Sequence, residues 1–307
     1  MNLIWLLIKT AFCLLIIIAF LYNFFTHFIL WMELRLLTIG PNNVHAKIGM
    51  RYSWLNLIKS FFIEFCCILV NILLYPIRFI SKKQKQISSL HSSSAIPILF
   101  VHGYLHNQMA WFWFIRHLQK KPAIGALYTI NLFPFFASSR ELAEQLKEKI
   151  NHIQRETGSY QVILIGHSMG GIICSYFCEY LAKFRQVAMV ITLGSPFKGT
   201  RVAAFGFGKN AKEMCPASLF LTELRARIKL SRVPYYSIAS KIDNVIIPWQ
   251  SALSSDESET KTQLIVEDHG HLRLLISPLI IQQVADWISI NKNTNNHIHN
   301  ITFDGGR

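Results

Sequence analysis

The 307-residue sequence predicts an α/β fold, with a mostly parallel sheet of about six strands flanked by helices and preceded by an N-terminal membrane helix or helices. From residue 96 onward, short apolar runs rich in β-branched residues alternate with stretches of helical periodicity, which is typical of buried parallel strands. The first 80 residues are instead dominated by two long apolar stretches. The chain is 51% hydrophobic and only 16% charged, which excludes disorder for most of it.

The first element is a run of 23 residues without charge, Thr10–Met32. A helix of that length spans the hydrocarbon core of a bilayer, which is about 30 Å thick. The alternative is a cleaved secretory signal, whose apolar core usually has about 7–15 residues and ends at a small-residue cleavage site. This run is longer and lacks such a site. We therefore expect an uncleaved membrane helix.

A second apolar stretch, Tyr52–Ile80, is interrupted by Lys59 and Glu64, and Pro76 disturbs its end. It fits a second spanning helix, a re-entrant segment or a helix lying in the interface equally well. Basic residues flank both stretches, so charge does not fix the side of the following domain. We expect residues 1–80 to anchor the chain in a membrane, in a bacterium the inner membrane, and residues 81–95 to form a polar linker.

The charge pattern indicates which kinds of molecule the protein binds, and the cysteine pattern indicates whether it holds disulfides or a metal. The formal net charge is +14, but about half of the excess lies in the first 95 residues, beside the apolar stretches. That placement favours anionic lipid head groups. No stripe of Lys or Arg interleaved with aromatic residues follows, so we expect no nucleic-acid partner; protein partners stay open. The six cysteines form no C-x-x-C pair and predict neither a disulfide framework nor a metal site.

Residues 96–290 form the predicted α/β domain, and residues 291–307 a polar tail that we expect to be disordered. Helical periodicity covers 137–156, 169–183 and 272–290. The expected strands are residues 96–101, 126–133, 162–165, 187–193, 235–239 and 263–266.

The strongest chemical signal is G-H-S-M-G-G at residues 166–171, directly after the strand V-I-L-I. It matches G-x-S-x-G, in which a serine on a strained strand-to-helix turn projects above the sheet. Ser168 is therefore the candidate nucleophile. Gly166 and Gly170 remove side chains that would collide where the helix starts close to the strand. The backbone N–H of Met169 is the first candidate oxyanion donor, because it lies at the helix N-terminus.

A serine nucleophile needs a base that an acid orients, and in this type of sheet the chain order is Ser, Asp or Glu, then His. Asp243 is the best candidate acid, because it follows the strand Y-Y-S-I-A in a loop at the carboxyl end of the sheet. The segment E-D-H-G-H-L-R-L-L offers His269 and His271 as the base. We prefer His271, which directly precedes the last helix. We expect His269 to be a residue of the loop or one that supports the site, and His167 to have a structural role.

The second candidate oxyanion donor comes from F-V-H-G-Y-L after the first strand, where Gly103 makes a turn and the N–H of Tyr104 can face the site. An apolar insertion after Pro196 is expected to cover the active site and to suit acyl chains, although it also fits ordinary packing against the domain. The aromatic run of residues 111–114 fits either the same pocket or the core.

Five motifs occur in this order in the chain: F-V-H-G-Y, G-H-S-M-G-G, T-L-G-S-P-F-K-G-T, S-K-I-D-N-V-I-I-P and G-H-L-R-L-L. Over about residues 96–290 they resemble α/β-hydrolase lipases, in particular triacylglycerol lipases and esterases. The resemblance implies an α/β-hydrolase fold, a triad of Ser168, Asp243 and His271, and Tyr104 and Met169 as oxyanion donors.

The resemblance also implies cleavage of carboxylic esters, in particular lipid acyl esters, through an acyl-enzyme and without a cofactor. Phe197 stands where many relatives have His, which leaves the substrate preference open. Two alternatives remain. The same triad could serve an acyltransferase or thioesterase, or the domain could be a catalytically silent membrane binding module.

Overall fold

The computed structural model describes residues 2–39, 54–76, 95–122, 124–255 and 262–303. The predicted linker 81–95 lies outside this part of the chain except for its last residue. All neighbouring strands of the sheet run parallel, in the order β2-β1-β3-β4-β5-β6. This confirms the predicted fold class. The strands are β1 (Ile98–Val101), β2 (Leu127–Ile130), β3 (Val162–His167), β4 (Val187–Leu193), β5 (Tyr235–Ser240) and β6 (Gln263–Val266).

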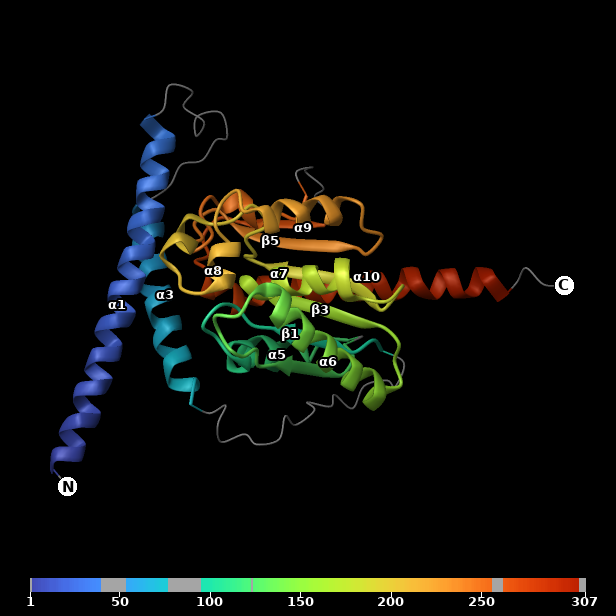
Figure 1. The fold of residues 1–307 in the computed structure, drawn as a ribbon, viewed down its shortest axis with the longest axis horizontal. Helices are drawn as coiled ribbons and strands as arrows, with labels where there is room; N and C mark the ends of the chain where they lie inside the picture. The colour runs from blue at the N-terminus through green and yellow to red at the C-terminus, as the bar shows by residue number, and fades with distance from the viewer. Residues whose placement is uncertain (1, 40–53, 77–94, 123, 256–261, 304–307) are drawn as a thin grey trace.

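Helices cover both faces of the sheet (Figure 1). The side chains of β1 alternate between them: Ile98 and Phe100 join one buried cluster, and Leu99 and Val101 join the other. The first cluster includes side chains from η1 (Gln108–Trp111), α5 (Phe112–Leu118) and α10 (Pro278–Phe303), and the second includes α6 (Ser139–Thr157) and α7 (Met169–Tyr176). The remaining helices of the domain are η2 (Phe177–Leu181), η3 (Arg201–Phe205), α8 (Lys209–Glu213), α9 (Leu219–Lys229), η4 (Trp249–Ala252) and η5 (Leu272–Leu275).

Local signals account for the bounds of α6. The Ser138 hydroxyl accepts the N–H of Glu141 while the Glu141 carboxylate accepts the N–H of Ser138, which is a complete capping box. Gly158 ends the helix in the left-handed region, at φ 71°. A buried stripe at helical spacing, including Leu142 and Leu146, holds α6 against the sheet.

The C-terminal region differs from the expectation in two ways. The expected helix 272–290 is divided into η5 and α10, because Pro278 fits the first turn of a new helix but not the interior of one. Helix α10 then continues to Phe303, through most of the tail that we expected to be disordered. Residues 291–303 contain neither Gly nor Pro, so no residue type that breaks helices ends α10 earlier.

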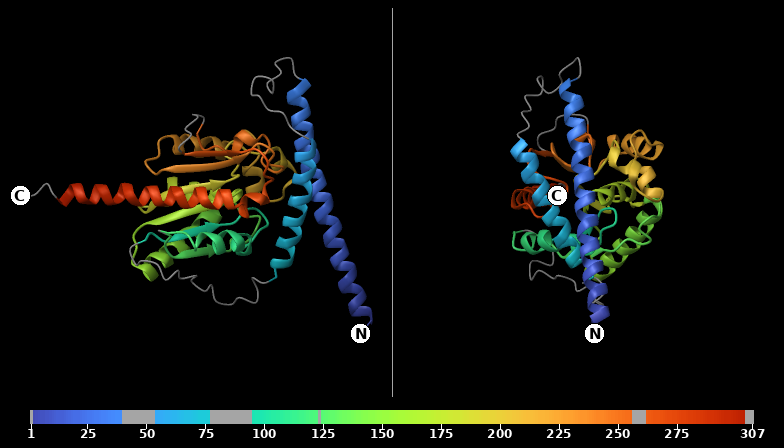
Figure 2. Two further views of the ribbon diagram at one scale, coloured as in Figure 1. Left: turned by 180° about the vertical axis from the view of Figure 1, so that it is seen from behind. Right: turned by 90° about the vertical axis from the view of Figure 1, so that its left-hand side faces the viewer.

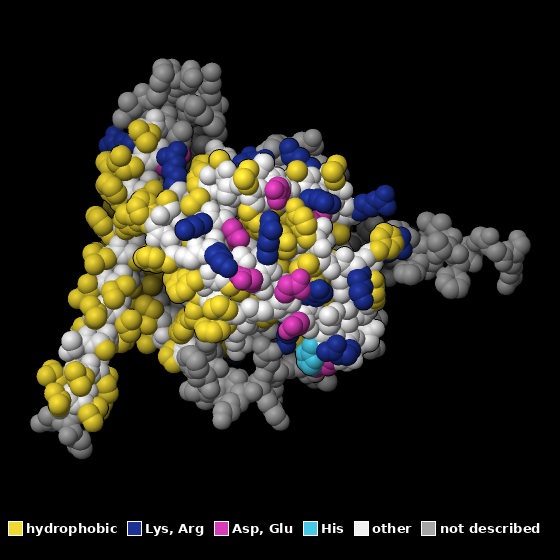
Figure 3. All heavy atoms as spheres, viewed as in Figure 1, with side chains coloured by type: hydrophobic (Ala, Val, Ile, Leu, Met, Phe, Trp, Pro, Cys, Tyr) yellow, Lys and Arg dark blue, Asp and Glu magenta, His cyan; other side chains and the backbone are white. Residues whose placement is uncertain are grey.

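The two N-terminal apolar stretches form long helices, α1 (Asn2–Ile39) and α3 (Trp54–Leu74). Both are long and apolar enough to cross a membrane, although a signal sequence or a core helix has the same character. They lie side by side across one end of the sheet (Figures 1 and 2). Large apolar side chains cover the visible surface of this helix pair, whereas charged side chains gather on the α/β domain (Figure 3).

Candidate active site

The turn between β3 and α7 has the backbone strain expected of a nucleophile elbow. Ser168 has φ 55° and ψ −127°, a conformation that non-glycine residues rarely adopt. Such strain persists only where the surrounding structure enforces it, and it is concentrated at functional sites. The turn places Ser168 after the last residue of β3, with 8% of its surface exposed.

Three glycines allow close backbone packing here, one within the elbow itself and two between the elbow and the turn after β1. A Cβ atom at Gly166 would lie 2.4 Å from the Cα of Gly171. At Gly170 it would lie 2.2 Å from the carbonyl oxygen of Val101, and at Gly103 it would lie 2.9 Å from the Cβ of Ser168. These contacts place the Gly103 turn directly beside the elbow, as the sequence motifs predict.

Replacing Gly170 by Ala is expected to lower both stability and activity, because the carbonyl of Val101 belongs to a buried strand that cannot move away. Overpacking of this kind typically costs about 1–3 kcal/mol. The control is Gly158→Ala, which strains a left-handed residue far from the elbow but meets no atom within 4 Å. Both variants should lower the melting temperature, and only Gly170→Ala should also slow the ester hydrolysis that the sequence motifs predict. Equal activity of the two variants would contradict this role of the glycine.

Asp243 and His271 form a buried, hydrogen-bonded pair. The His271 Nδ1–H donates to Oδ2 of Asp243 at 2.9 Å, and the two residues are only 5% and 1% exposed, respectively. The second carboxylate oxygen, Oδ1, accepts the N–H groups of Val245 and Ile246, each at 2.8 Å. Both oxygens of the acid are therefore fixed. Because Nδ1 carries the proton, Nε2 of the neutral ring is free to accept one.

His167 is buried between the elbow and His271. Its Nε2–H donates to the carbonyl of His271 at 3.2 Å, and the centroids of the two rings are 4.5 Å apart. Burial holds the pKa of His167 well below 6.5, so this ring stays neutral and does not repel a protonated His271. The structural role expected of His167 is compatible with this packing and stays a prediction.

Among the described residues, no hydrogen bond joins the Ser168 hydroxyl to the His271 ring. Ser168 is linked in sequence to His167, which contacts His271, so the two candidates belong to one cluster. Hydrogen bonds between catalytic groups are often long in the free protein and shorten only when substrate binds. The arrangement is therefore compatible with a triad, whose catalytic role stays a prediction.

The other candidate base is turned away from Asp243. His269 donates from Nδ1 to Asp268 at 2.8 Å, and its Nε2 accepts the hydroxyl of Ser277 at 2.8 Å. Both of its ring nitrogens are therefore occupied. Asp268 also accepts a hydrogen bond from Arg273 and is not available as the acid.

The two candidate oxyanion donors lie on the elbow and the adjoining turn. Met169 is the first residue of α7, so its N–H is one of those that a helix leaves without an intrahelical partner. The Tyr104 phenol accepts the N–H of Phe207 at 2.9 Å and donates to the Phe207 carbonyl at 2.8 Å. These bonds fasten the turn after β1 to the insertion that follows β4. The prediction for Tyr104 concerned its backbone only, and no sequence signal indicated this side-chain role.

Several structural neighbours of the site were not predicted. A Cβ at Gly194, which has φ 55°, would lie 3.1 Å from Asp243 Oδ2 and 3.2 Å from His271 Nδ1. Asn244 accepts the N–H of His271 at 3.1 Å. The T-L-G-S-P motif contains Gly194, and Asn244 follows the acid, so both had a sequence signal. A third neighbour is Glu64, which comes from α3. Its only sequence signal was that it is an acidic residue within an apolar run.

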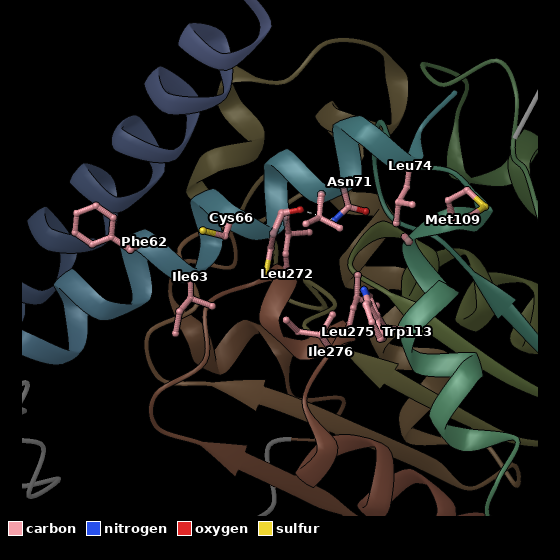
Figure 4. A pocket seen from close by; sticks show the side chains of 13 residues that line it. Phe62, Ile63, Cys66, Asn71, Leu74, Met109, Trp113, Leu272, Leu275 and Ile276 are labelled. Carbon is pink, nitrogen blue, oxygen red and sulfur yellow. Dashed lines mark hydrogen bonds between the residues drawn. The ribbon is translucent and has the colours of Figure 1, made fainter. Parts of the chain in front are cut away.

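An apolar cavity of about 320 Å³ separates part of α3 from the domain (Figure 4). Cys66 and Val70 line it from α3, and Met109, Trp113 and Leu272 line it from the domain. Leu272 follows His271, but the cavity lining includes neither His271 nor Ser168. It is therefore a neighbour of the candidate site and not the site itself.

The aromatic run 111–114 and the insertion after β4 each contain both buried and exposed apolar side chains. Trp111 and Phe114 are fully buried core residues, whereas Phe112 and Trp113 are exposed.

In the insertion, Phe197 is buried in the packing of α9 against α7. The larger apolar side chains at its surface are Phe205, Phe207, Leu219 and Leu230. The Phe205 ring packs edge-on against Phe25 of α1, with centroids 4.9 Å apart.

A family model described as "alpha/beta hydrolase fold" matches residues 96–214. Curated relatives include triacylglycerol lipases of Pseudarthrobacter phenanthrenivorans and Burkholderia plantarii, each 28% identical over 123 residues, or 38% of this chain. A lysosomal thioesterase of Xenopus laevis is 28% identical over 112 residues, or 36% of this chain. The matched regions are only 37%, 33% and 38% of those three proteins, respectively.

Solved structures show the same fold. A Bacillus licheniformis lipase in its mature form matches with a TM-score of 0.55 at 18% identity, covering 65% of this chain and 94% of that one. Lipase B of Aspergillus fumigatus matches with a TM-score of 0.54 at 19% identity, covering 64% of this chain and 53% of that one. The chain therefore has the α/β-hydrolase fold, and lipases and esterases are among its distant relatives.

Proposed function

We propose that the protein is a membrane-anchored serine hydrolase that cleaves carboxylic esters, with lipid acyl esters as its substrates. One observation carries the proposal: a strained serine elbow adjoins a buried Asp–His pair at the carboxyl end of a parallel sheet. The order Ser168, Asp243, His271 is the one that the α/β-hydrolase fold uses. The distant homology to triacylglycerol lipases supports apolar esters as substrates.

The proposed mechanism has two acyl-transfer steps. The Ser168 oxygen attacks the ester carbonyl carbon as His271 Nε2 takes its proton, and the bond to Asp243 stabilises the imidazolium that forms. The negative oxygen of the tetrahedral intermediate accepts hydrogen bonds from the N–H groups of Tyr104 and Met169. Its collapse breaks the ester bond, and the alcohol leaves with the proton from His271. Water then hydrolyses the acyl-serine by the same sequence of transfers.

The arrangement of the helix pair supports a lipid substrate and a membrane location. Four of its polar side chains, Asn23, Thr26, Ser60 and Glu64, are buried, whereas most of its large exposed side chains are apolar. Soluble proteins rarely expose a continuous apolar surface of this extent. A lipid bilayer covers such a surface without cost, so we infer that the helix pair anchors the domain beside its substrate.

The proposal is tested by labelling the full-length protein, in detergent and in vesicles, with a fluorophosphonate probe. Peptide mapping should place the label on Ser168. Hydrolysis should then be measured over a series of esters from acetyl to palmitoyl, and longer chains should be preferred. Failure of the folded protein to react with either the probe or any ester would instead support a catalytically silent membrane module.

The similarity to a lysosomal thioesterase supports acyl thioesters as a second candidate class of substrate. The same triad and acyl-enzyme serve thioester cleavage, because only the leaving group differs. The panel should therefore include a thioester of each acyl length. Product analysis in the presence of a lipid alcohol separates hydrolysis from acyl transfer, since transfer yields a new ester.

A further inference from the structure

Glu64 is an acidic residue in the middle of the apolar helix α3, and it is bonded to the segment that carries the candidate base. Only 1% of its surface is exposed. Its Oε2 accepts the N–H of Leu272 and its Oε1 accepts the N–H of Arg273, both at 2.8 Å. These two residues directly follow His271, so both oxygens of the carboxylate hold the backbone turn that begins at the base.

Further contacts hold the backbone just before Leu272, at Gly270 and His271. A Cβ atom at Gly270 would lie 2.2 Å from Cγ of Glu64, so the carboxylate side chain packs against the backbone before His271 as well as after it. The N–H of His271 itself donates to Asn244, whose side-chain amide donates to the hydroxyl of Thr26 in α1 at 2.8 Å. Both helices of the pair are therefore connected to the turn.

A purely architectural role for Glu64, fixing α3 to the domain, is the simpler alternative. The helix pair has a separate attachment of that kind, the ion pair between Glu33 of α1 and Arg201 of η3. Glu33 is also buried, but its partner lies in the insertion after β4 and not beside the base. Glu64 instead uses both oxygens on backbone N–H groups. Burying a carboxylate is costly, and two charge-assisted hydrogen bonds offset the cost only while the turn keeps this geometry.

We propose that Glu64 is a positioning residue for His271, so that the apolar helix pair is a functional part of the active site and not only an anchor. The carboxylate fixes the backbone at residues 271–273, and the backbone sets where the His271 ring meets Asp243 and the substrate. The catalytic half of this inference rests on the proposed function. The structural half, that Glu64 orders the turn, does not.

The experiment compares Glu64→Ala, Glu64→Gln and the matched control Glu33→Ala in the full-length protein, using a soluble short-chain ester. A displacement of about 1 Å in a catalytic group can cost on the order of 100-fold in rate. We expect Glu64→Ala to lower kcat by about that factor, with KM changed less than about threefold. Glu64→Gln retains one acceptor oxygen and should be intermediate. Glu33→Ala should keep a kcat close to that of the unmodified protein.

Hydrogen exchange provides a readout that does not depend on activity. Backbone amides of residues 270–276 should exchange at least about tenfold faster in Glu64→Ala than in Glu33→Ala, because only the former loses acceptors in this turn. Unchanged exchange would overturn the inference, even if the unmodified protein proved inactive and the proposed function failed. Faster exchange with an unchanged kcat, or an equal loss of kcat in Glu33→Ala, would also overturn it.

Discussion

Replacing Ser168 by Ala is expected to reduce ester hydrolysis by about 10⁶-fold, the loss typical when the nucleophile of a triad is removed. Without the hydroxyl no acyl-enzyme can form, and His271 has no serine proton to accept. The measurement is kcat on the preferred ester, together with fluorophosphonate labelling, which should disappear. What remains should be the weak acceleration that oxyanion donors and binding supply on their own.

The same substitution should leave the fold intact. Ala meets the same strain as Ser at φ 55°, and the Ser168 hydroxyl has no hydrogen-bond partner in the described part of the chain. The melting temperature and membrane attachment should therefore match those of the unmodified protein. Undiminished hydrolysis by the folded variant would contradict the assignment of the nucleophile.

The fold was predictable from the sequence because its signals are local. Each strand is a short, largely apolar segment of four to seven residues, and β4 and β6 have the expected bounds. The elbow was predictable for the same reason, since six consecutive residues carry both the serine and the glycines that its turn needs. The Asp243–His271 contact joins residues only 28 apart, on loops that adjacent strands bring to one edge of the sheet.

The position of the helix pair was not predictable in this way. The hydropathy of α3 shows that it is apolar, but it does not show which surface the helix contacts, and three arrangements fitted the sequence equally well. The hydrogen bond from Leu272 to Glu64 joins residues that are 208 positions apart in the sequence. No local sequence pattern can therefore indicate it. In the sequence Glu64 is an interruption of an apolar run. Only the fold reveals that its carboxylate meets the backbone beside His271.

Replacing Asp243 by Asn is expected to lower kcat by about 10⁴-fold, as removal of the charge from the acid of a triad does elsewhere. The side-chain oxygen of Asn can still accept the N–H groups of Val245 and Ile246, so its NH₂ group must take the place of Oδ2. There it faces His271 Nδ1, and two donors cannot bond. The ring then favours the tautomer protonated at Nε2, which cannot accept the proton of Ser168.

The comparison with Asp243→Ala separates this electronic effect from stability. Ala leaves the N–H groups of Val245 and Ile246 without the carboxylate, which should cost about 1–3 kcal/mol of unfolding free energy in addition to activity. Asn should cost much less stability, so its loss of kcat reports on the proton position alone. Asp286→Asn is the matched control, because this exposed carboxylate on α10 bonds only Gln282 among the described residues and should leave kcat unchanged. A rate for Asp243→Asn close to that of Asp286→Asn would show that another group orients His271.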